Sequence, residues 1–403
     1  MEVRPGYKLT EVGVIPEDWR TVAATDIVDP NAPICYGVVQ VGRDVDTGVP
    51  IVAIKFVKEI GSAPLHRTAR DLERPYARSR VKSGDVLISI KGTIGRVGLV
   101  PDGFEGNISR ELARLRPRRE YCGEYIAHQL EADSTQARIS RAVVGTTRLE
   151  FSIATLRQFQ LPVPPSSSEQ HAIAEALSDV DALLGALDQL IAKKRDLKQA
   201  AMQQLLTGQT HLPGFHGEWE FKRLGEVADI SKGEQLQSQG TAGEGDIPHY
   251  NGGISPSSYT HRANAPADSI AISEGGNSCG YVQFIAQPFW CGGHCYLVKP
   301  KSVDKRFLYH ALKARQQSIM GLRVGSGLPN VQKSALQGFS LALPGEMSEQ
   351  TAIATSLSDM DAELAALEAR RAKTHALKQA MMQELLTGRT RLVRTDDCGA
   401  EAC

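Results

Sequence analysis

Positively charged side chains gather in two runs of the first half of the chain, and their chemistry suggests contact with phosphate. The run LHRTARDLERPYARSRVK (65–82) interleaves arginines with a tyrosine, and SRELARLRPRR (109–119) follows it. Guanidinium groups bind phosphates and base edges, and an aromatic ring can stack on a base. A solvated charged face is the usual alternative for one such run, but two runs in one region favour nucleic-acid contact. The candidate DNA-binding residues here are Arg67, Arg70, Arg74, Tyr76, Arg78, Arg80, Lys82, Lys91, Thr93, Asn107, Arg110 and Arg148.

A second set of candidates, in the second half of the chain, is polar rather than basic. The stretches HYNGG (249–253), EGGNS (274–278) and PNVQK (329–333) place amides beside glycines. Asn and Gln can form bidentate hydrogen bonds with base edges, although Asn-Gly pairs are first of all turn formers. The candidates are His249, Tyr250, Asn251, Glu274, Asn277, Ser278, Asn330, Gln332 and Lys333.

Motifs of catalysis are not found in the sequence. A phosphate loop of the GxxxxGK[ST] type, a GxSxG elbow and an HExxH pair are all missing. The glycines of KGTIGRVG (91–98) favour a β-turn between two strands, because their spacing differs from a nucleotide-binding loop and no helix follows. A stand-alone enzyme is therefore the weaker hypothesis, and we expect no catalytic residue in this chain.

The seven cysteines are an odd number spread over a long chain, which favours reduced thiols over a disulfide framework. The one cluster, CGGHC (291–295), lies among strand-like apolar residues and is interpreted as buried thiols rather than a zinc site. We expect neither a metal ion nor another cofactor in this chain.

Length and composition indicate a globular protein of several domains. The chain has 403 residues, 41% of them hydrophobic and 23% charged, with a formal net charge of zero. Neither a signal peptide nor an apolar stretch that could span a membrane is recognised, so a cytoplasmic location without membrane contact is expected. The zero net charge conceals basic modules that alternate with more acidic helical ones.

Nearly the same helical sequence occurs twice, and it must position the two candidate regions. Residues 168–212 match residues 348–392 without a gap at more than half of the positions, and both copies end in LLTG. Ser166 and Glu169 have capping-box spacing, and Gly208 and Gly388 are suited to left-handed helix stops. Apolar residues at heptad spacing predict that the two helices pack on each other: Ile173, Leu177, Val180, Leu184, Leu187 and Ile191, and Ile353, Leu357, Met360, Leu364 and Leu367.

The region before each helix is predicted to be rich in short strands. VPIVAIKFV (49–57), GDVLISIKGTIGRVGLV (84–100), DSIAISEGG (268–276) and CGYVQFI (279–285) are β-branched runs broken by glycines. Each region begins near a tryptophan, Trp19 or Trp219, and ends with a short helix, EYIAHQLEA (124–132) or KRFLYHALKA (305–314). The two regions otherwise differ, whereas the helices that follow them are repeated.

This organisation resembles the specificity subunits of type I restriction-modification systems. The stretches that carry the resemblance cover nearly the whole chain: GYKLTEVGVIPEDW (6–19), VKSGDVLISIKGTIGRVGLV (81–100), GNISRELARLRP (106–117), PVPPSSSEQHAIAEALSDVDALL (162–184) and GEWEFKRLGEVADISKG (217–233).

The resemblance implies an α+β fold with two mixed α/β target-recognition domains and two long antiparallel coiled-coil helices of pseudo-twofold symmetry. The expected divisions are recognition domains at 1–165 and 213–345, conserved helices at 166–212 and 346–392, and a disordered tail at 393–403. Each recognition domain would read one half of a bipartite, asymmetric site on double-stranded DNA.

The resemblance also implies partners that perform the chemistry. Two methyltransferase subunits would bind S-adenosylmethionine, and restriction subunits would use ATP and magnesium. This chain would dock these subunits but would itself bind none of the three cofactors. Two alternatives stay open at this point. One is a coiled-coil adaptor that holds two unlike protein-binding modules, and the other is the stand-alone enzyme.

Overall fold

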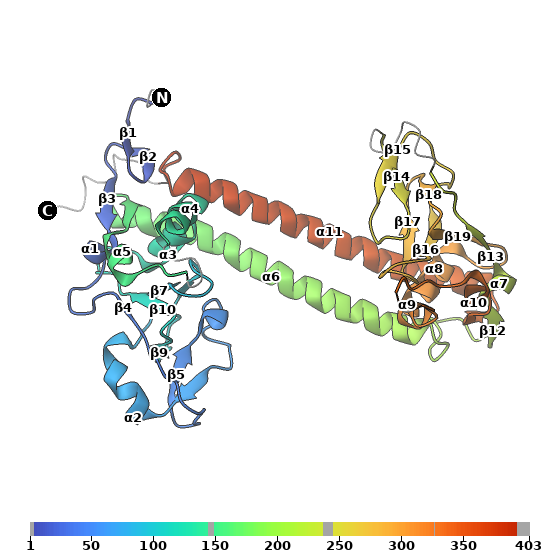
Figure 1. The fold of residues 1–403 in the computed structure, drawn as a ribbon, viewed down its shortest axis with the longest axis horizontal. Coiled ribbons are helices and arrows are strands. Elements are labelled where there is room, and N and C mark those ends of the chain that lie inside the picture. Colours follow the sequence, from blue (N-terminus) through green and yellow to red (C-terminus); the bar gives the residue numbers. More distant parts are fainter. Residues whose placement is uncertain (1–3, 144–148, 237–244, 326, 393–403) are drawn as a thin grey trace. The chain divides into compact units, whose positions relative to one another are not determined.

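The computed structural model describes residues 4–143, 149–236, 245–325 and 327–392. Two compact units divide the chain (Figure 1), the first formed by residues 1–186 with 371–403 and the second by residues 187–370. Arg148 and the tail at 393–403 lie outside the described residues. Because the division falls inside both long helices, each unit contains a part of each helix.

The first unit is built from two small sheets and two strand pairs beside short helices. An antiparallel sheet has the order β4-β10-β7-β8, and a second has the order β6-β5-β9 with β5 and β9 parallel. Its strands are β1 (Tyr7–Thr10), β2 (Gly13–Pro16), β3 (Arg20–Ala23), β4 (Cys35–Tyr36), β5 (Val49–Val52), β6 (His66–Thr68), β7 (Val86–Ser89), β8 (Val97–Leu99), β9 (Asn107–Ile108), β10 (Leu112–Leu115) and β11 (Gln160–Val163). Its short helices are α1 (Ala24–Ile27), η1 (Ile54–Phe56), α2 (Arg70–Glu73), η2 (Arg74–Ser79), α3 (Gly123–Glu131), α4 (Asp133–Ala142) and α5 (Ile153–Gln158).

The second unit repeats the order of the two larger sheets and one of the strand pairs. Its four-stranded sheet has the order β13-β19-β16-β17, and its three-stranded sheet has the order β15-β14-β18 with β14 and β18 parallel. Its strands are β12 (Trp219–Arg223), β13 (Ala228–Lys232), β14 (Ile247–Tyr250), β15 (Ser258–Thr260), β16 (Ser269–Ser273), β17 (Val282–Ile285), β18 (Trp290–Cys291), β19 (Cys295–Pro300) and β20 (Ser340–Pro344). Its short helices are α7 (Leu224–Val227), α8 (Lys305–Ala314), α9 (Gln316–Met320) and α10 (Lys333–Gln337).

The long helices are α6 (Ser167–Leu205) and α11 (Met347–Leu385), and they run antiparallel within each unit. In the first unit Lys378 Nζ lies 2.6 Å from a carboxylate oxygen of Asp181. In the second unit Lys198, which occupies the matching place in the repeat, pairs with Asp361. The residues at heptad spacing are all buried or half-buried. Ile173 also joins the apolar core of the first recognition region, so the seam serves the domain as well as the partner helix.

The helix ends confirm one prediction and contradict another. Gly208 and Gly388 follow the helices with φ of 72° and 68°, as expected for left-handed stops. A Cβ atom on Gly388 would lie 3.1 Å from the Trp19 ring, so close packing also favours glycine there. The capping box at Ser166 is wrong, because the buried Glu169 carboxylate binds the Arg391 guanidinium instead, with Nη2 and Oε2 2.8 Å apart.

Matched hydrogen bonds tie each short helix to its long helix. His128 on α3 lies 3.2 Å from the Ser178 hydroxyl, and His310 on α8 lies 3.1 Å from the Ser358 hydroxyl. Both imidazoles are buried, and burial lowers the pKa of each to about 4. The predicted helices α3 and α8 are therefore confirmed, and each is fixed to the repeat by the same contact.

The five cysteines that the structure describes are free and buried, which confirms their interpretation as reduced thiols. They are Cys35, Cys122, Cys279, Cys291 and Cys295. The described residues include no helix that is long and apolar enough to cross a membrane.

Candidate nucleic-acid interface

The arginine-rich run forms a surface segment of the first unit, here called the basic segment (residues 70–82). It contains α2 and η2 and connects β6 to β7, and the buried Glu73 fixes it. The Glu73 carboxylate accepts hydrogen bonds from Arg80, Nε at 2.8 Å and Nη2 at 2.6 Å. These bonds hold the pKa of Glu73 below its ordinary value against the opposing effect of burial. The pair orders the segment although more than half of the Arg80 side chain is exposed.

Asn107 binds the same segment from the interior of the domain, and its side chain is not accessible to DNA in this structure. Its side chain is fully buried in β9, where its amide nitrogen donates to Glu73 Oε1 at 2.7 Å and to the Tyr76 carbonyl at 3.0 Å. Its amide oxygen accepts from the Ser79 hydroxyl at 2.8 Å. The structure therefore corrects the expectation for Asn107: it positions the basic segment, because its hydrogen-bonding groups are used inside the domain.

Two arginines of the second run are also structural. Arg114 on β10 is 2% exposed, and its guanidinium donates to the carbonyls of Arg78 (2.9 Å), Arg80 (3.0 Å) and Pro33 (3.1 Å). Arg116 forms a two-pronged pair with the buried Asp85, both distances being 2.7 Å. The run 109–119 is thus not the uniform contact surface that its sequence suggested.

Several predicted contacts remain on the surface. Within the described residues, the side chains of Arg67, Arg74, Arg78 and Lys82 are exposed without a hydrogen-bond or ion-pair partner. Arg70 donates to the Thr47 carbonyl at 3.4 Å, Arg110 pairs with Glu111 at 3.1 Å, Lys91 lies 3.3 Å from Glu150, and Tyr76 is half-buried. Thr93 is exposed in the turn between β7 and β8, which confirms the β-turn predicted for KGTIGRVG.

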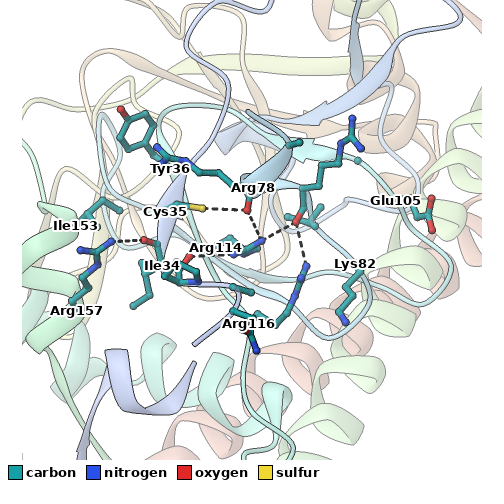
Figure 2. Close-up of a pocket in the computed structure, with 17 residues that line it drawn as sticks. Ile34, Cys35, Tyr36, Arg78, Lys82, Glu105, Arg114, Arg116, Ile153 and Arg157 are labelled. Atoms are coloured by element: carbon teal, nitrogen blue, oxygen red, sulfur yellow. Dashed lines mark hydrogen bonds between the residues drawn. The ribbon is translucent and has the colours of Figure 1, made fainter. Parts of the chain in front are cut away.

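A cavity of about 580 Å³ opens beneath the basic segment. Figure 2 shows Arg78 and Lys82 of this segment at the cavity, together with Arg114 on β10 and Arg116 directly after β10. Arg157 comes from α5 and donates to the Ile34 carbonyl at 3.1 Å. The cavity thereby joins residues that are far apart in the sequence into one basic site.

The second unit brings its predicted polar residues together in a pocket of about 610 Å³, here called the polar pocket. The three glycine-flanked stretches meet there, contributing Asn251, Glu274, Ser278 and Asn330. Lys232 and His294 also line it, and sequence reasoning missed both. The signal for His294 was present in CGGHC, but it was considered only as a possible metal ligand. Lys232 carried no local signal.

Glu274 is the centre of charge in the polar pocket. Its Oε1 accepts from Lys232 Nζ at 2.7 Å and from the Tyr296 hydroxyl at 3.0 Å, while His294 Nδ1 lies 3.6 Å from its Oε2. Burial, with the hydrogen bond to this carboxylate, raises the pKa of Tyr296 to about 12, so Tyr296 stays a donor at neutral pH. A carboxylate among amides can accept from the exocyclic amine of a base.

The other candidates of the second unit divide into buried and exposed residues. His249 is 7% exposed and its Nδ1 lies 2.9 Å from the Ser258 hydroxyl, so the structure corrects its assignment from a surface contact to a strand-fixing residue. Burial lowers its pKa. Tyr250 packs edge-on against Phe289. Exposed positions are found for Asn277, Gln332 and Lys333. In the described residues no group of three or more His, Cys, Asp or Glu side chains could hold a metal ion.

The match to a known protein family covers most of the chain. The family model "Type I restriction modification DNA specificity domain" matches residues 16–194 and 216–375. The chain belongs to this family. Its two matched stretches each contain one of the two recognition regions and part of the long helix that follows, and we call the regions specificity domains from here on.

Individual relatives agree with the family. A type I specificity subunit of Escherichia coli, EcoBI, is 27% identical over 228 residues, 55% of this chain and 46% of that protein. The chain therefore matches less than half the length of that relative. A putative subunit of Methanocaldococcus jannaschii, MjaX, is 25% identical and is covered to 97%, with 96% of this chain. The crystal structure of an S subunit from M. genitalium shares the fold, with a TM-score of 0.69, 18% identity and coverage of 96% and 98%.

The two specificity domains thus offer different surfaces on the same α+β frame. In the first domain, the basic segment is fixed by the pair of Glu73 and Arg80, and it presents exposed guanidinium and ammonium groups next to the basic cavity. The second presents amides, a carboxylate and an imidazole in the polar pocket. Cations suit phosphate contact, while the amides and the carboxylate suit base edges.

Proposed function

We propose that this chain is the DNA specificity subunit of a type I restriction-modification complex, and that it has no catalytic role of its own. Each specificity domain reads one half of a bipartite, asymmetric site on double-stranded DNA. The observation that carries the proposal is the repetition of one domain topology with two unlike surfaces, the basic segment and the polar pocket. Two identical readers would select a symmetric site, whereas unlike readers select an asymmetric one.

The partners of the proposal are those that the chemistry requires. In the proposed complex, two methyltransferase subunits bind S-adenosylmethionine and transfer the methyl group. Restriction subunits perform the translocation and cleavage that depend on ATP and magnesium. This chain only recognises the DNA sequence. The long helices α6 and α11 offer exposed charged sides on which such subunits can dock. The arginines and Lys82 of the basic segment set the register on phosphates, and the amides of the polar pocket contact base edges.

Mapping of modified adenines in genomic DNA tests the proposal directly. Cells that carry the gene should show methylation at a split, asymmetric motif, and the motif should disappear when the gene is deleted and return with a plasmid copy. Exchange of the second specificity domain for that of a relative should change only one half of the motif. A methylation pattern that is unchanged by deletion would reject the proposal.

The adaptor alternative makes a different prediction for the purified complex. A coiled-coil adaptor for two proteins would give no salt-dependent DNA footprint, whereas a specificity subunit gives one whose strength falls steeply with salt. The exposed cations of the basic segment favour the DNA-binding role.

A further inference from the structure

The cavity beneath the basic segment contains more positive charge than the neighbouring carboxylates neutralise. Asp85 pairs with Arg116, and Glu73 pairs with Arg80. Glu105 is the one acidic residue among the described residues that line the cavity, and it forms no ion pair with them. Within the part of the chain that the structure describes, four lining cations have no carboxylate partner: Arg78, Lys82, Arg114 and Arg157.

Arg114 is the least expected of these cations, because its charge is buried. Its Nη atoms donate to three backbone carbonyls, and its Nε has no hydrogen-bond partner among the residues that the structure describes. Burial lowers the pKa of the guanidinium, but an arginine remains protonated at neutral pH. Carbonyl dipoles satisfy hydrogen bonds without cancelling a full charge, and a buried unpaired cation is unfavourable. An anion in the cavity would remove that cost.

The second unit shows that the fold does not need this charge. β10 pairs with β7 so that Arg114 lies opposite Leu87, and β19 pairs with β16 so that Leu297 lies opposite Ala271. The strands occupy the same places in their two sheets, and Leu297 therefore occupies the position of Arg114. Leu297 is 6% exposed and packs in an apolar cluster with Phe289. A leucine thus satisfies this position in the sister domain, so the sheet itself does not need a buried charge here, although the Arg114 hydrogen bonds hold the backbone of the basic segment.

We propose that this cavity is a phosphate-binding site of the first unit. Arg157, Arg78 and Lys82 hold the phosphate oxygens, and the unneutralised charge of Arg114 attracts the anion from below. Figure 2 shows Arg157 and Lys82 to either side of Arg114, on α5 and after η2, so the cations come from separate elements. The volume, about 580 Å³, is that of a small-ligand site and exceeds what one phosphate group fills.

The inference rests on the proposed function where the phosphate belongs to the DNA backbone. In that case the cavity sets the register of the first specificity domain on the duplex, because a phosphate is held at one defined place. A free phosphate or nucleotide has the same chemistry and would bind the same cations. Two measurements on the full chain distinguish these sources.

The first measurement is the salt dependence of duplex DNA binding, by fluorescence anisotropy. Each neutralised phosphate contributes about 0.9 to the slope of log K against log salt. Arg157→Gln should lower the slope by about this amount, and Arg114→Leu, which introduces the residue type that the second unit has at this position, should also lower it. Arg141→Gln removes an exposed cation of α4 outside the cavity and should leave the slope unchanged. Circular dichroism of each variant checks that it is folded.

The second measurement is the melting temperature in inorganic phosphate, compared with chloride at equal ionic strength. Phosphate should raise the melting temperature of the unchanged chain and of Arg141→Gln more than that of Arg157→Gln. If the chain bound phosphate in this way but no duplex, the cavity would stand and the DNA-reading function would fall. If folded Arg157→Gln and Arg114→Leu matched the unchanged chain in both measurements, the cavity assignment would be wrong while DNA binding could stand.

Discussion

The two specificity domains share the same internal contacts but differ in their surfaces. Each has the same strand orders, and each fixes its short helix to a long helix through a buried histidine and a serine. Between the second strand of the small sheet and the next strand of the large sheet, the first unit carries residues 69–85 and the second only 261–268. The longer connection contains the basic segment. Contacts that determine the fold are thus repeated, while the connections that can meet a ligand are not.

The difference also reaches the interior. Arg114 and Leu297 occupy equivalent places, and the buried Glu73 with Asn107 belongs only to the domain that has the basic segment. A buried polar network is unfavourable unless it is fully satisfied, so its presence here marks a segment whose conformation matters. Between the two domains of this chain, the surface therefore differs together with the few core positions that hold it.

The largest expected change in stability concerns the tryptophans at the start of each domain. Trp19 is fully buried and Trp219 half-buried, and each lies against the left-handed glycine that follows a long helix. Trp19→Ala should lower the free energy of unfolding of the first unit by about 3 to 5 kcal/mol, as for buried aromatic residues in general. Trp219→Ala should cost the second unit clearly less, since part of its ring already contacts water.

Hydrogen exchange followed by mass spectrometry measures this difference, because peptides from each unit report its opening separately. A global melting curve would not do so for a chain of two units. Equal losses of protection for the two variants in their own units would contradict the ranking. Loss of protection in both units from either variant would mean that the two unfold together.

The parts that the sequence predicts well are those set by local periodicity. The helices at 124–132 and 305–314, the seam of α6 and α11, and the two glycine stops follow from spacing and residue type. Burial of Asn107 and Arg114 could not be predicted in this way, because it depends on partners such as the Arg78 carbonyl, brought near by the pairing of β10. The sequence predicts the three stretches that line the polar pocket, but only as separate loops. Their convergence depends on the pairing of the strands, and for this reason the sequence does not predict that Lys232 lines the pocket.

The second test uses acid, and it should affect both domains alike. The folded state holds His128 and His310 neutral with a pKa of about 4, whereas the unfolded chain titrates near 6.5. Between these values the unfolded state binds more protons, so the free energy of unfolding should fall as pH decreases from about 6.5 to about 4, and this contribution should level off below that. The loss is on the order of 3 kcal/mol for each histidine, taking about 1.4 kcal/mol for each pKa unit.

Urea denaturation at several pH values, read by hydrogen exchange in each unit, checks this prediction. His128→Gln should flatten the pH dependence of the first unit only, and His310→Gln that of the second only. The two variants are matched controls for each other. A pH dependence that stays unchanged in both variants would assign it to carboxylates, which titrate at lower pH.

The smallest expected effect is the difference in stability between the two units when each loses the lysine of its ion pair between the long helices. Lys378 pairs with Asp181, and a second carboxylate, Glu131 of α3, lies 3.9 Å from its ammonium group. Lys198 pairs with Asp361, but α8 brings Lys313 rather than a carboxylate, and that ammonium donates to the Val282 carbonyl. Lys378→Met should therefore destabilise its unit by about 1 kcal/mol and Lys198→Met by less, since exposed pairs contribute about 0 to 1 kcal/mol.

Double-mutant cycles with Asp181→Asn and Asp361→Asn isolate the coupling energy of each ion pair. Because an ion pair near the surface weakens with salt, the difference should shrink at high salt, and a difference that persisted would indicate packing of the lysine stem instead.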